Sequence, residues 1–386
     1  MKLKSRPEDF QVAEQIGPLP EGGPHALYRL TKRGLGTPEA IAAISRRWRI
    51  RPEQVAYAGL KDRHAVTVQH VTIYHGPRRD LKQTSLQLTY LGQVDRPIAS
   101  KDITANRFCI VLRDLSPDEA ARACEALPAV RRDGLPNYFD QQRFGSVGAS
   151  GEFVARAWCA GDYERAVWLA LADPNPHDRP GQRAAKQWLR EHWGNWQRAM
   201  EQSRDLPARE VLAYLAGHPG DYRRTMARFR PQLRSLFLAA YQSHLWNRML
   251  AELIREHCPP GQRVDVDLGG WSVPFFRELS DAQRAALAAV ELPLPSARVR
   301  NEVEPWRGLL DRVLAGEGLA LGQLRVKYPR DSFFSKGSRA AVFAVDRLEH
   351  EVGSDEQCPG RRKLVLRLEL PRGCYATIVT RCIALG

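Results

Sequence analysis

The chain has 386 residues, of which 43% are hydrophobic, 26% charged and 8% aromatic, a balance typical of globular proteins and not of collagen-like or disordered chains. At roughly 150 residues per domain, this length predicts two or three structural units, each able to bury its own core. Lys and Arg number 58 against 44 Asp and Glu, a net charge of +14. Such an excess of positive charge makes a polyanion, above all a nucleic acid, the leading partner.

The seven cysteines contain no C-x-x-C pair, which fits a reducing cytosol. The N-terminus lacks the apolar core of a signal peptide, and no apolar run approaches the roughly 18 residues of a spanning helix. The sequence also lacks an H-E-x-x-H motif and a Walker A lysine. We therefore expect a cytoplasmic, monomeric protein with no membrane span, no metal and no cofactor.

The first part of the chain mixes strands and helices without a regular alternation. Residues 10–12 and 27–30 are predicted to be short strands, and Thr37-Pro38-Glu39 is predicted to begin a helix with Thr37 as its N-cap. Ser116-Pro117-Asp118-Glu119 has the pattern of a capping box and predicts a second helix to about residue 127. Further strands are predicted around residues 66–74, 86–90 and 108–112. This order favours an α+β fold with a mixed, mainly antiparallel sheet.

The middle of the chain differs from the first part in composition and periodicity. Residues 151–254 have helical periodicity and contain many tryptophans, whereas residues 261–343 are richer in glycine and proline and include a predicted strand at 264–268. Two basic stretches lie here, at 223–234 and 325–339. The first is either a solvated helix face or a contact with RNA phosphates.

Strict alternation of leucines returns at residues 364–370, and residues 375–383 are predicted to form one more strand. We expect these strands to rejoin the first sheet. The predicted organisation is a core domain built on this sheet, made of residues 1–155 and 346–386, with residues 156–345 inserted as a separate α+β domain.

One short segment has the composition of a catalytic turn. Asp62 follows Gly59 and is flanked by Lys61 and Arg63 at the start of a predicted strand. Nearby positive charge favours an ionised carboxylate, and an ionised, fixed Asp can act as a nucleophile. The alternative is a surface Asp–Arg ion pair, because Lys61 and Arg63 would point away from Asp62 in an extended segment.

Two further segments combine aromatic and polar side chains. Residues 137–145 offer an amide from Asn137 and rings that include Phe139. Amides can read a base edge and rings can hold an unstacked base, although a packed loop with a structural Arg–Asp pair fits equally well. In residues 372–377, Gly373 precedes Tyr375 at the start of the last predicted strand.

Together, and in this order, these segments resemble the TruD family of pseudouridine synthases. The resemblance spans essentially the full length and rests on the following residues: Lys4, Pro7 to Phe10, Val12, Glu14, His25 to Tyr28, GLKDRHAVTVQ (59–69), Asn106 to Phe108, NYFDQQRFG (137–145), Ala240 to Ser243, Trp246, Asn247, and Gly373 to Thr377. It implies a pseudouridine synthase core with an inserted TRUD domain, acting on transfer RNA, usually at uridine 13.

The resemblance also implies residue roles. Asp62 matches the catalytic aspartate, and Phe10, Asn137 and Tyr375 match positions that contact the target nucleotide. Phe139, beside Asn137, is expected to line the same pocket, although at Tyr375 the family often has phenylalanine. Lys4 is either the basic partner of Asp62 or a phosphate contact.

The chemistry is consistent with these residue types. Converting uridine to pseudouridine breaks N1–C1′ and makes C5–C1′ within one nucleotide, so it requires no redox partner, phosphate donor or metal. The base must leave its stack, so a pocket built from aromatic rings and an amide is needed to hold it. The alternative function is a non-catalytic RNA-binding or RNA-chaperone protein. A nuclease would need clustered carboxylates for metal ions, which these motifs do not contain.

Overall fold

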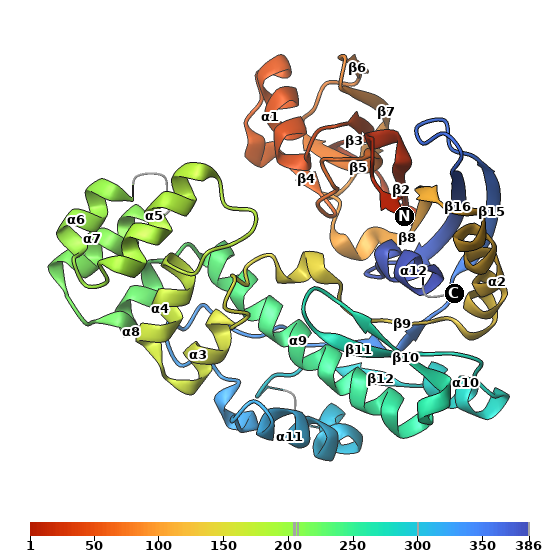
Figure 1. Ribbon diagram of the computed structural model, residues 1–386. Helices are drawn as coiled ribbons and strands as arrows, with labels where there is room; N and C mark the ends of the chain where they lie inside the picture. Colours follow the sequence, from red (N-terminus) through yellow and green to blue (C-terminus); the bar gives the residue numbers. More distant parts are fainter. Residues whose placement is uncertain (204–205, 207, 299–300, 385–386) are drawn as a thin grey trace. The chain divides into compact units, whose positions relative to one another are not determined.

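The computed structural model describes residues 1–203, 206, 208–298 and 301–384 (Figure 1). It divides into two compact units: residues 1–135 with 343–386 form the first unit, and residues 136–342 form the second unit. Residues 136–155, which we expected in the core, therefore lie in the second unit. The backbone explains this, because the Asn137 N–H donates to the Ala341 carbonyl at 2.8 Å and the Phe139 N–H donates to the Asn247 side chain at 2.8 Å.

The first unit is built on a 10-stranded sheet in the order β15-β16-β8-β2-β5-β3-β7-β6, with β1 paired to β8 and β4 to β5. Neighbouring strands are antiparallel except β2 and β5, which are parallel. The strands are β1 Lys2–Leu3, β2 Phe10–Ile16, β3 Glu21–Arg33, β4 Val55–Tyr57, β5 Val66–Tyr74, β6 Leu81–Lys82, β7 Leu86–Val94, β8 Ile103–Leu115, β15 Asp346–Ser354 and β16 Arg362–Pro371. The predicted mixed, mainly antiparallel α+β fold is confirmed.

Within the described residues, the first unit has three α-helices, α1 Thr37–Trp48, α2 Pro117–Asp133 and α12 Ala376–Ile383. Helices α1 and α2 pack against the sheet, and α12 packs on α2. The apolar face of α1, including Ile41 and Ile44, packs on Tyr28, Leu30 and Val71 of the sheet. Helix α2 contacts α12, β8, β15 and β16 (Figure 1). On β16 the predicted alternation is buried, because the leucines at 364, 366, 368 and 370 are at most 3% exposed, and each contributes about 1.5–3 kcal/mol when removed from water.

Two details of the predicted secondary structure are wrong. Residues 375–383 are not a strand, because Ala376 to Ile383 form α12, whose buried side chains Ile378, Val379 and Ile383 follow a helical and not an alternating period. The N-cap of α1 is Gly36 and not Thr37. The Thr37 hydroxyl instead accepts a hydrogen bond from the loop that contains Asp62.

A buried charge network fixes the start of β2. The Arg113 guanidinium, 1% exposed, donates to Asp9 at 2.9–3.0 Å and to Asp355 at 2.8 Å. Arg113 lies on β8, and Asp355 follows β15. Because an unpaired buried charge is costly, this network holds the segment before Phe10 against the sheet.

The second unit is mainly helical. Its helices are α3 Val154–Ala160, α4 Tyr163–Leu171, α5 Pro180–Glu191, α6 Trp196–Gln202, α7 Arg209–Gly217, α8 Tyr222–Thr225, α9 Pro231–His257, α10 Asp281–Ala288 and α11 Arg307–Ala315. Antiparallel pairing joins β10 Arg263–Asp267 to β11 Ser272–Phe276 as a hairpin, and joins β12 Glu291–Pro293 to the sequence-distant β13 Ser338–Ala340. Helix α9 contacts α3, α11, β11 and β12, which makes it the central element of this unit (Figure 1).

Shorter elements connect these helices and strands. The strands β9 Leu135–Pro136 and β14 Val342–Phe343 lie where the chain passes from one unit to the other. The 3₁₀ helices are Pro7–Asp9, Pro52–Gln54, Ser100–Asp102, Gln141–Phe144, Met226–Arg228, Pro260–Gln262, Asn301–Trp306 and Leu321–Gln323. Within the described ranges, no helix has both the length and the apolar character needed to cross a bilayer.

Candidate active site

Asp62 lies in the loop between β4 and β5, and its carboxylate pairs with Lys4. The Lys4 Nζ is 2.5 Å from the Asp62 Oδ2, with side-chain exposures of 20% and 38%. Lys4 has φ +58°, a left-handed conformation uncommon for lysine. Its Nζ also lies 4.0 Å from the centre of the Phe10 ring, close enough for a cation–π contact. Lys4, Phe10 and Asp62 therefore form one cluster.

The backbone of this loop is held by side chains from the sheet and from α1. The Thr37 hydroxyl accepts a hydrogen bond from the Lys61 N–H at 3.0 Å and donates one to the Gln69 Oε1 at 2.9 Å. The Gln69 Nε2 donates to the Gly59 carbonyl at 3.3 Å. Thr37 and Gln69 are fully buried, so the loop residues on the N-terminal side of Asp62 are fixed through their main chain.

Lys32 holds the loop from a third direction. Lys32 lies on strand β3, and its Nζ donates to the carbonyl oxygens of Leu35 at 2.6 Å, Asp62 at 3.0 Å and Lys61 at 3.3 Å. The side chain is buried, and burial lowers the pKa of the Lys32 ammonium to about 8, against the attraction of Asp62 and Glu39. An ammonium has three donors, and here each one meets a carbonyl oxygen.

The two cations next to Asp62 in sequence have other partners. The Lys61 Nζ lies 3.0 Å from the Glu14 carboxylate and donates to the Asn106 Oδ1 at 2.8 Å. Arg63 lies 3.9 Å from Glu39. Burial opposes the ionisation of Glu14, but hydrogen bonds from His70 and the charge of Lys61 bring its pKa below the usual value. The Asp–Arg ion pair considered from the sequence is thus not the arrangement seen, since Asp62 pairs with Lys4.

Asn137 and Phe139 lie in the second unit, connected by Arg339. The Arg339 Nε donates to the Asn137 carbonyl at 2.9 Å, and its Nη2 donates to the Asn137 side-chain oxygen. The same guanidinium lies 4.3 Å from the centre of the Phe139 ring, whose other contacts include Trp246 at 5.5 Å. Asn137 also donates to the Ala340 carbonyl at 2.9 Å. Asn137 and Phe139 are buried, at 4% and 9% exposure.

Tyr375 is the N-cap residue of α12 and is partly exposed. It belongs to the first unit with Lys4, Phe10 and Asp62, whereas Asn137 and Phe139 belong to the second unit. The structure therefore groups the predicted site residues as one cluster of three, one pair joined by Arg339, and Tyr375 at a helix start.

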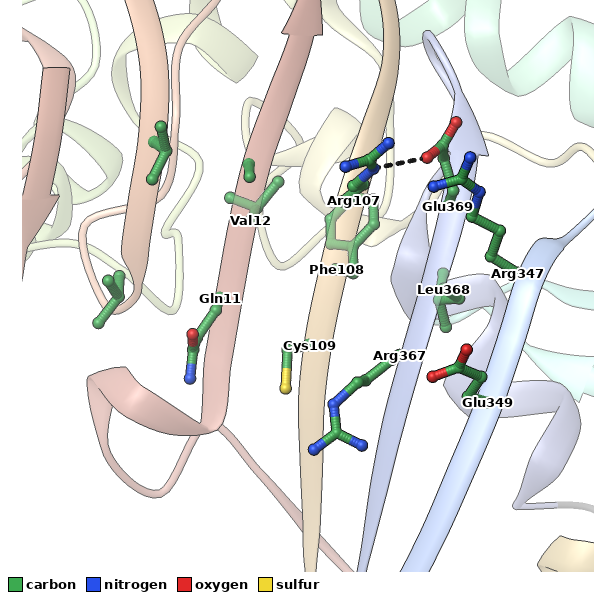
Figure 2. Close-up of a pocket in the computed structure, with 13 residues that line it drawn as sticks. Gln11, Val12, Arg107, Phe108, Cys109, Arg347, Glu349, Arg367, Leu368 and Glu369 are labelled. Atoms are coloured by element: carbon green, nitrogen blue, oxygen red, sulfur yellow. Dashed lines mark hydrogen bonds and ion pairs between the residues drawn. The ribbon is translucent and has the colours of Figure 1, made fainter. Parts of the chain in front are cut away.

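A separate groove of about 340 Å³ crosses the sheet of the first unit (Figure 2). Gln11, Arg107, Cys109 and Glu369 line it, and Arg107 donates to Glu369 at 2.8 Å. Side chains alternate between the faces of a strand, so Gln11 points into the groove while its neighbour Phe10 points to the other face. None of the six predicted site residues lines this groove.

Sequence reasoning missed Lys32, Thr37 and Arg339 as parts of the site. A signal existed for Lys32, because it is a lysine in a strand whose alternate positions Tyr28 and Leu30 are apolar and fully buried. Thr37 was interpreted as a helix cap, which its residue type favours. Arg339 gave no local signal, since its contacts with Asn137 and Phe139 join positions about 200 residues apart.

The comparisons with known proteins cover the whole chain. A family model described as tRNA pseudouridine synthase D (TruD) matches residues 1–383. A probable tRNA pseudouridine synthase D 1 from Methanococcus maripaludis is 28% identical over 99% of this chain and 98% of its own length. A probable tRNA pseudouridine synthase D from Methanopyrus kandleri is 31% identical over 93% of this chain and 85% of its own length.

A solved structure is also similar. The crystal structure of the putative tRNA pseudouridine synthase D from Methanosarcina mazei has 25% sequence identity to this chain and a TM-score of 0.74. The match covers 100% of this chain and 93% of the other chain. The fold and these relatives define the class as the pseudouridine synthases, isomerases that act on tRNA. The chain belongs to the tRNA pseudouridine synthase D (TruD) family. The resemblance inferred from the sequence is confirmed.

Proposed function

We propose that this chain converts uridine to pseudouridine in transfer RNA, with uridine 13 as the target and Asp62 as the nucleophile. The observation that carries the proposal is the Asp62 carboxylate, 2.5 Å from the Lys4 ammonium on a loop anchored by Lys32, Thr37 and Gln69. A carboxylate held in one orientation and partly open to solvent has the properties that covalent catalysis requires.

The proposed reaction conserves all atoms of the nucleotide. The Asp62 carboxylate adds either to C1′ of the ribose or to C6 of the ring, and in both routes N1–C1′ breaks and C5–C1′ forms. The proton on C5 then leaves to solvent and N1 gains a proton. Lys4 has the role of balancing the charge of the carboxylate when it is released at the end of the cycle.

The rings of Phe10 and Tyr375 in the first unit, and the ring of Phe139 in the second unit, are the proposed stacking partners of the target nucleotide. Stacking on a ring is worth roughly 1–3 kcal/mol per base and does not depend on which base is bound. Polar groups must therefore provide recognition. We assign this role to Asn137 together with Arg339, because their hydrogen bonds hold an amide and a guanidinium beside Phe139.

The test is release of tritium from tRNA that carries ³H at C5 of uridine, with purified protein in the presence of EDTA. The proposal predicts one tritium released per tRNA, and none from a matched transcript with cytidine at position 13. Binding of tRNA without any release would favour the non-catalytic RNA-binding protein. Release from both transcripts would retain the activity but refute uridine 13 as the target.

A further inference from the structure

The second unit carries a basic surface made from two segments that are far apart in the sequence. Segment A comprises residues 223–230 and segment B comprises residues 325–336. The Arg223 guanidinium lies 5.4 Å from the centre of the Tyr328 ring, and the buried Arg234 forms a two-pronged ion pair with Asp331 at 2.6 and 2.8 Å. These contacts place segment B beside the start of α9, directly next to segment A.

The course of segment B along α9 is fixed at a second point. The Gln242 Nε2 donates to the carbonyls of Ser335 at 2.8 Å and Pro295 at 2.9 Å. From Arg234 to Gln242 the helix rises about 12 Å. Segment B therefore forms a ridge of defined conformation along the first half of α9.

The charge on this surface is almost entirely positive. Its exposed basic side chains are Arg223, Arg224, Arg228, Arg230, Arg298, Arg325, Lys327, Arg330 and Lys336. Of these, Arg224 pairs with Asp221. The sequence has no acid between residues 222 and 251, and Asp331 is the one acid between residues 318 and 345. Because Arg234 already pairs with Asp331, the other exposed cations keep their net charge. Such an uncompensated cluster costs self-repulsion unless a polyanion binds it.

Aromatic rings are interleaved with these cations. Phe333 is 56% exposed, and the Arg298 guanidinium lies 4.9 Å from the centre of its ring. The Arg228 guanidinium likewise lies 4.5 Å from the centre of the Tyr214 ring. An exposed phenylalanine contributes nothing to the core, whereas a ring beside a cationic track is the arrangement on which single-stranded nucleic acid stacks its bases.

We propose that segments A and B, with Arg298 and Phe333, form a docking surface for an unpaired stretch of RNA. Its phosphates follow the arginines and lysines, and one base stacks on Phe333. The proposal rests on the proposed function in taking tRNA as the bound RNA. It adds a specific binding surface in the second unit, outside the six predicted site residues.

The test is tRNA affinity of the full chain, measured by fluorescence anisotropy over a range of salt concentrations. Lys327→Ala combined with Arg330→Ala is expected to weaken binding at least tenfold at low salt and to reduce the slope of log K against log[salt] by about 1.5. Phe333→Ala is expected to weaken binding about tenfold with the slope unchanged, and Phe333→Trp to restore affinity.

The chain offers matched controls. Leu236→Ala removes a side chain that is also 56% exposed, and Arg307→Ala combined with Arg312→Ala removes two charges that pair with Asp311 and Glu256. Both controls are expected to bind like the wild type. The proposal is overturned if the test variants bind no worse than these controls, or if polyglutamate displaces tRNA as effectively as unlabelled tRNA does.

Binding and catalysis are read separately in this design. A chain that binds tRNA through this surface but releases no tritium from C5 would refute the proposed function and support the docking surface. If the chain releases tritium while the test variants keep full affinity for tRNA, the proposed function is supported and the docking surface is refuted.

Discussion

The Lys32 Nζ donates to the backbone carbonyl oxygen of Asp62 at 3.0 Å from within the sheet. This bond links a buried cation to the main chain of the proposed nucleophile and leaves the Asp62 carboxylate to Lys4. Buried side chains of the first unit thus hold the main chain at Asp62, and Lys4 holds its carboxylate.

The first prediction concerns Lys32→Met. This change leaves three carbonyl oxygens without their donor, at a cost of about 1–3 kcal/mol, and lets the loop move. Single-turnover pseudouridine formation is expected to slow at least tenfold while tRNA affinity stays the same, because a misplacement of about 1 Å is enough to reduce rates strongly. The control is Lys82→Met, at an exposed lysine of the same sheet. An unchanged rate in Lys32→Met would remove the positioning role.

The second prediction compares two changes at Lys4. Lys4→Met is expected to slow turnover at least tenfold, whereas Lys4→Arg is expected to retain more activity because it keeps a cation near Asp62 and Phe10. Thermal unfolding is expected to change little, since a partly exposed ion pair contributes about 0–1 kcal/mol. If Lys4→Met lowered tRNA affinity but not the rate on bound tRNA, Lys4 would be a phosphate contact.

The third prediction separates the ring of Tyr375 from its hydroxyl. Tyr375→Phe is expected to keep activity near that of the wild type, and Tyr375→Ala to lose roughly 1–3 kcal/mol of stacking with the target base. Steady-state kinetics on the tRNA transcript would measure both. Equal losses in the two variants would assign the hydroxyl, and not the ring, to the reaction.

The fourth prediction is a pH dependence of the second unit. Burial disfavours the charge of Glu317, but His244 and Arg248 lower its pKa to about 2 from 4.5. Because the pKa is lower in the folded state, this contribution is fully present above about pH 4.5 and is lost as the pH falls towards 2. Because solvent screens part of this charge, its contribution to the free energy of unfolding is on the order of 1–3 kcal/mol.

Glu317→Gln is therefore expected to destabilise the second unit at pH 7 and to flatten its pH dependence between pH 4.5 and 2. Denaturant unfolding followed by tryptophan fluorescence would report mainly on this unit, because Trp48 is the one tryptophan of the first unit. The same loss of stability with acid in the variant and in the wild type would contradict the assignment to Glu317.

The sequence predicted what depends on local pattern. The leucines of β16 and the capping box at Ser116 were predicted from periodicity and residue type, and the structure confirms both. The segment after Tyr375 was predicted wrongly because Ile378 and Val379 have strong strand propensity, while the helix that they form is selected by packing against α2.

The site also combines a residue predicted from local pattern with contacts that only the tertiary structure shows. Asp62 was chosen from a compact motif, but the cations next to it in sequence point elsewhere, and its partner Lys4 is 58 positions away. Lys32 and Arg339 act through backbone carbonyls and a ring face. The contacts of Lys32 and Arg339 depend on tertiary structure, so neither periodicity nor spacing could have predicted them, whereas the pairing of Lys4 with Asp62 was one of two roles expected from the family resemblance.

The most direct test of the central claim is single-turnover pseudouridine formation by Asp62→Asn, with tRNA affinity and circular dichroism measured on the same sample. The change keeps the size of the side chain and removes its charge. We predict that pseudouridine formation is abolished while the fold and the tRNA affinity remain those of the wild type. Wild-type rates in this variant would show that Asp62 is not the nucleophile, and an unfolded variant would make Asp62 a structural ion-pair residue.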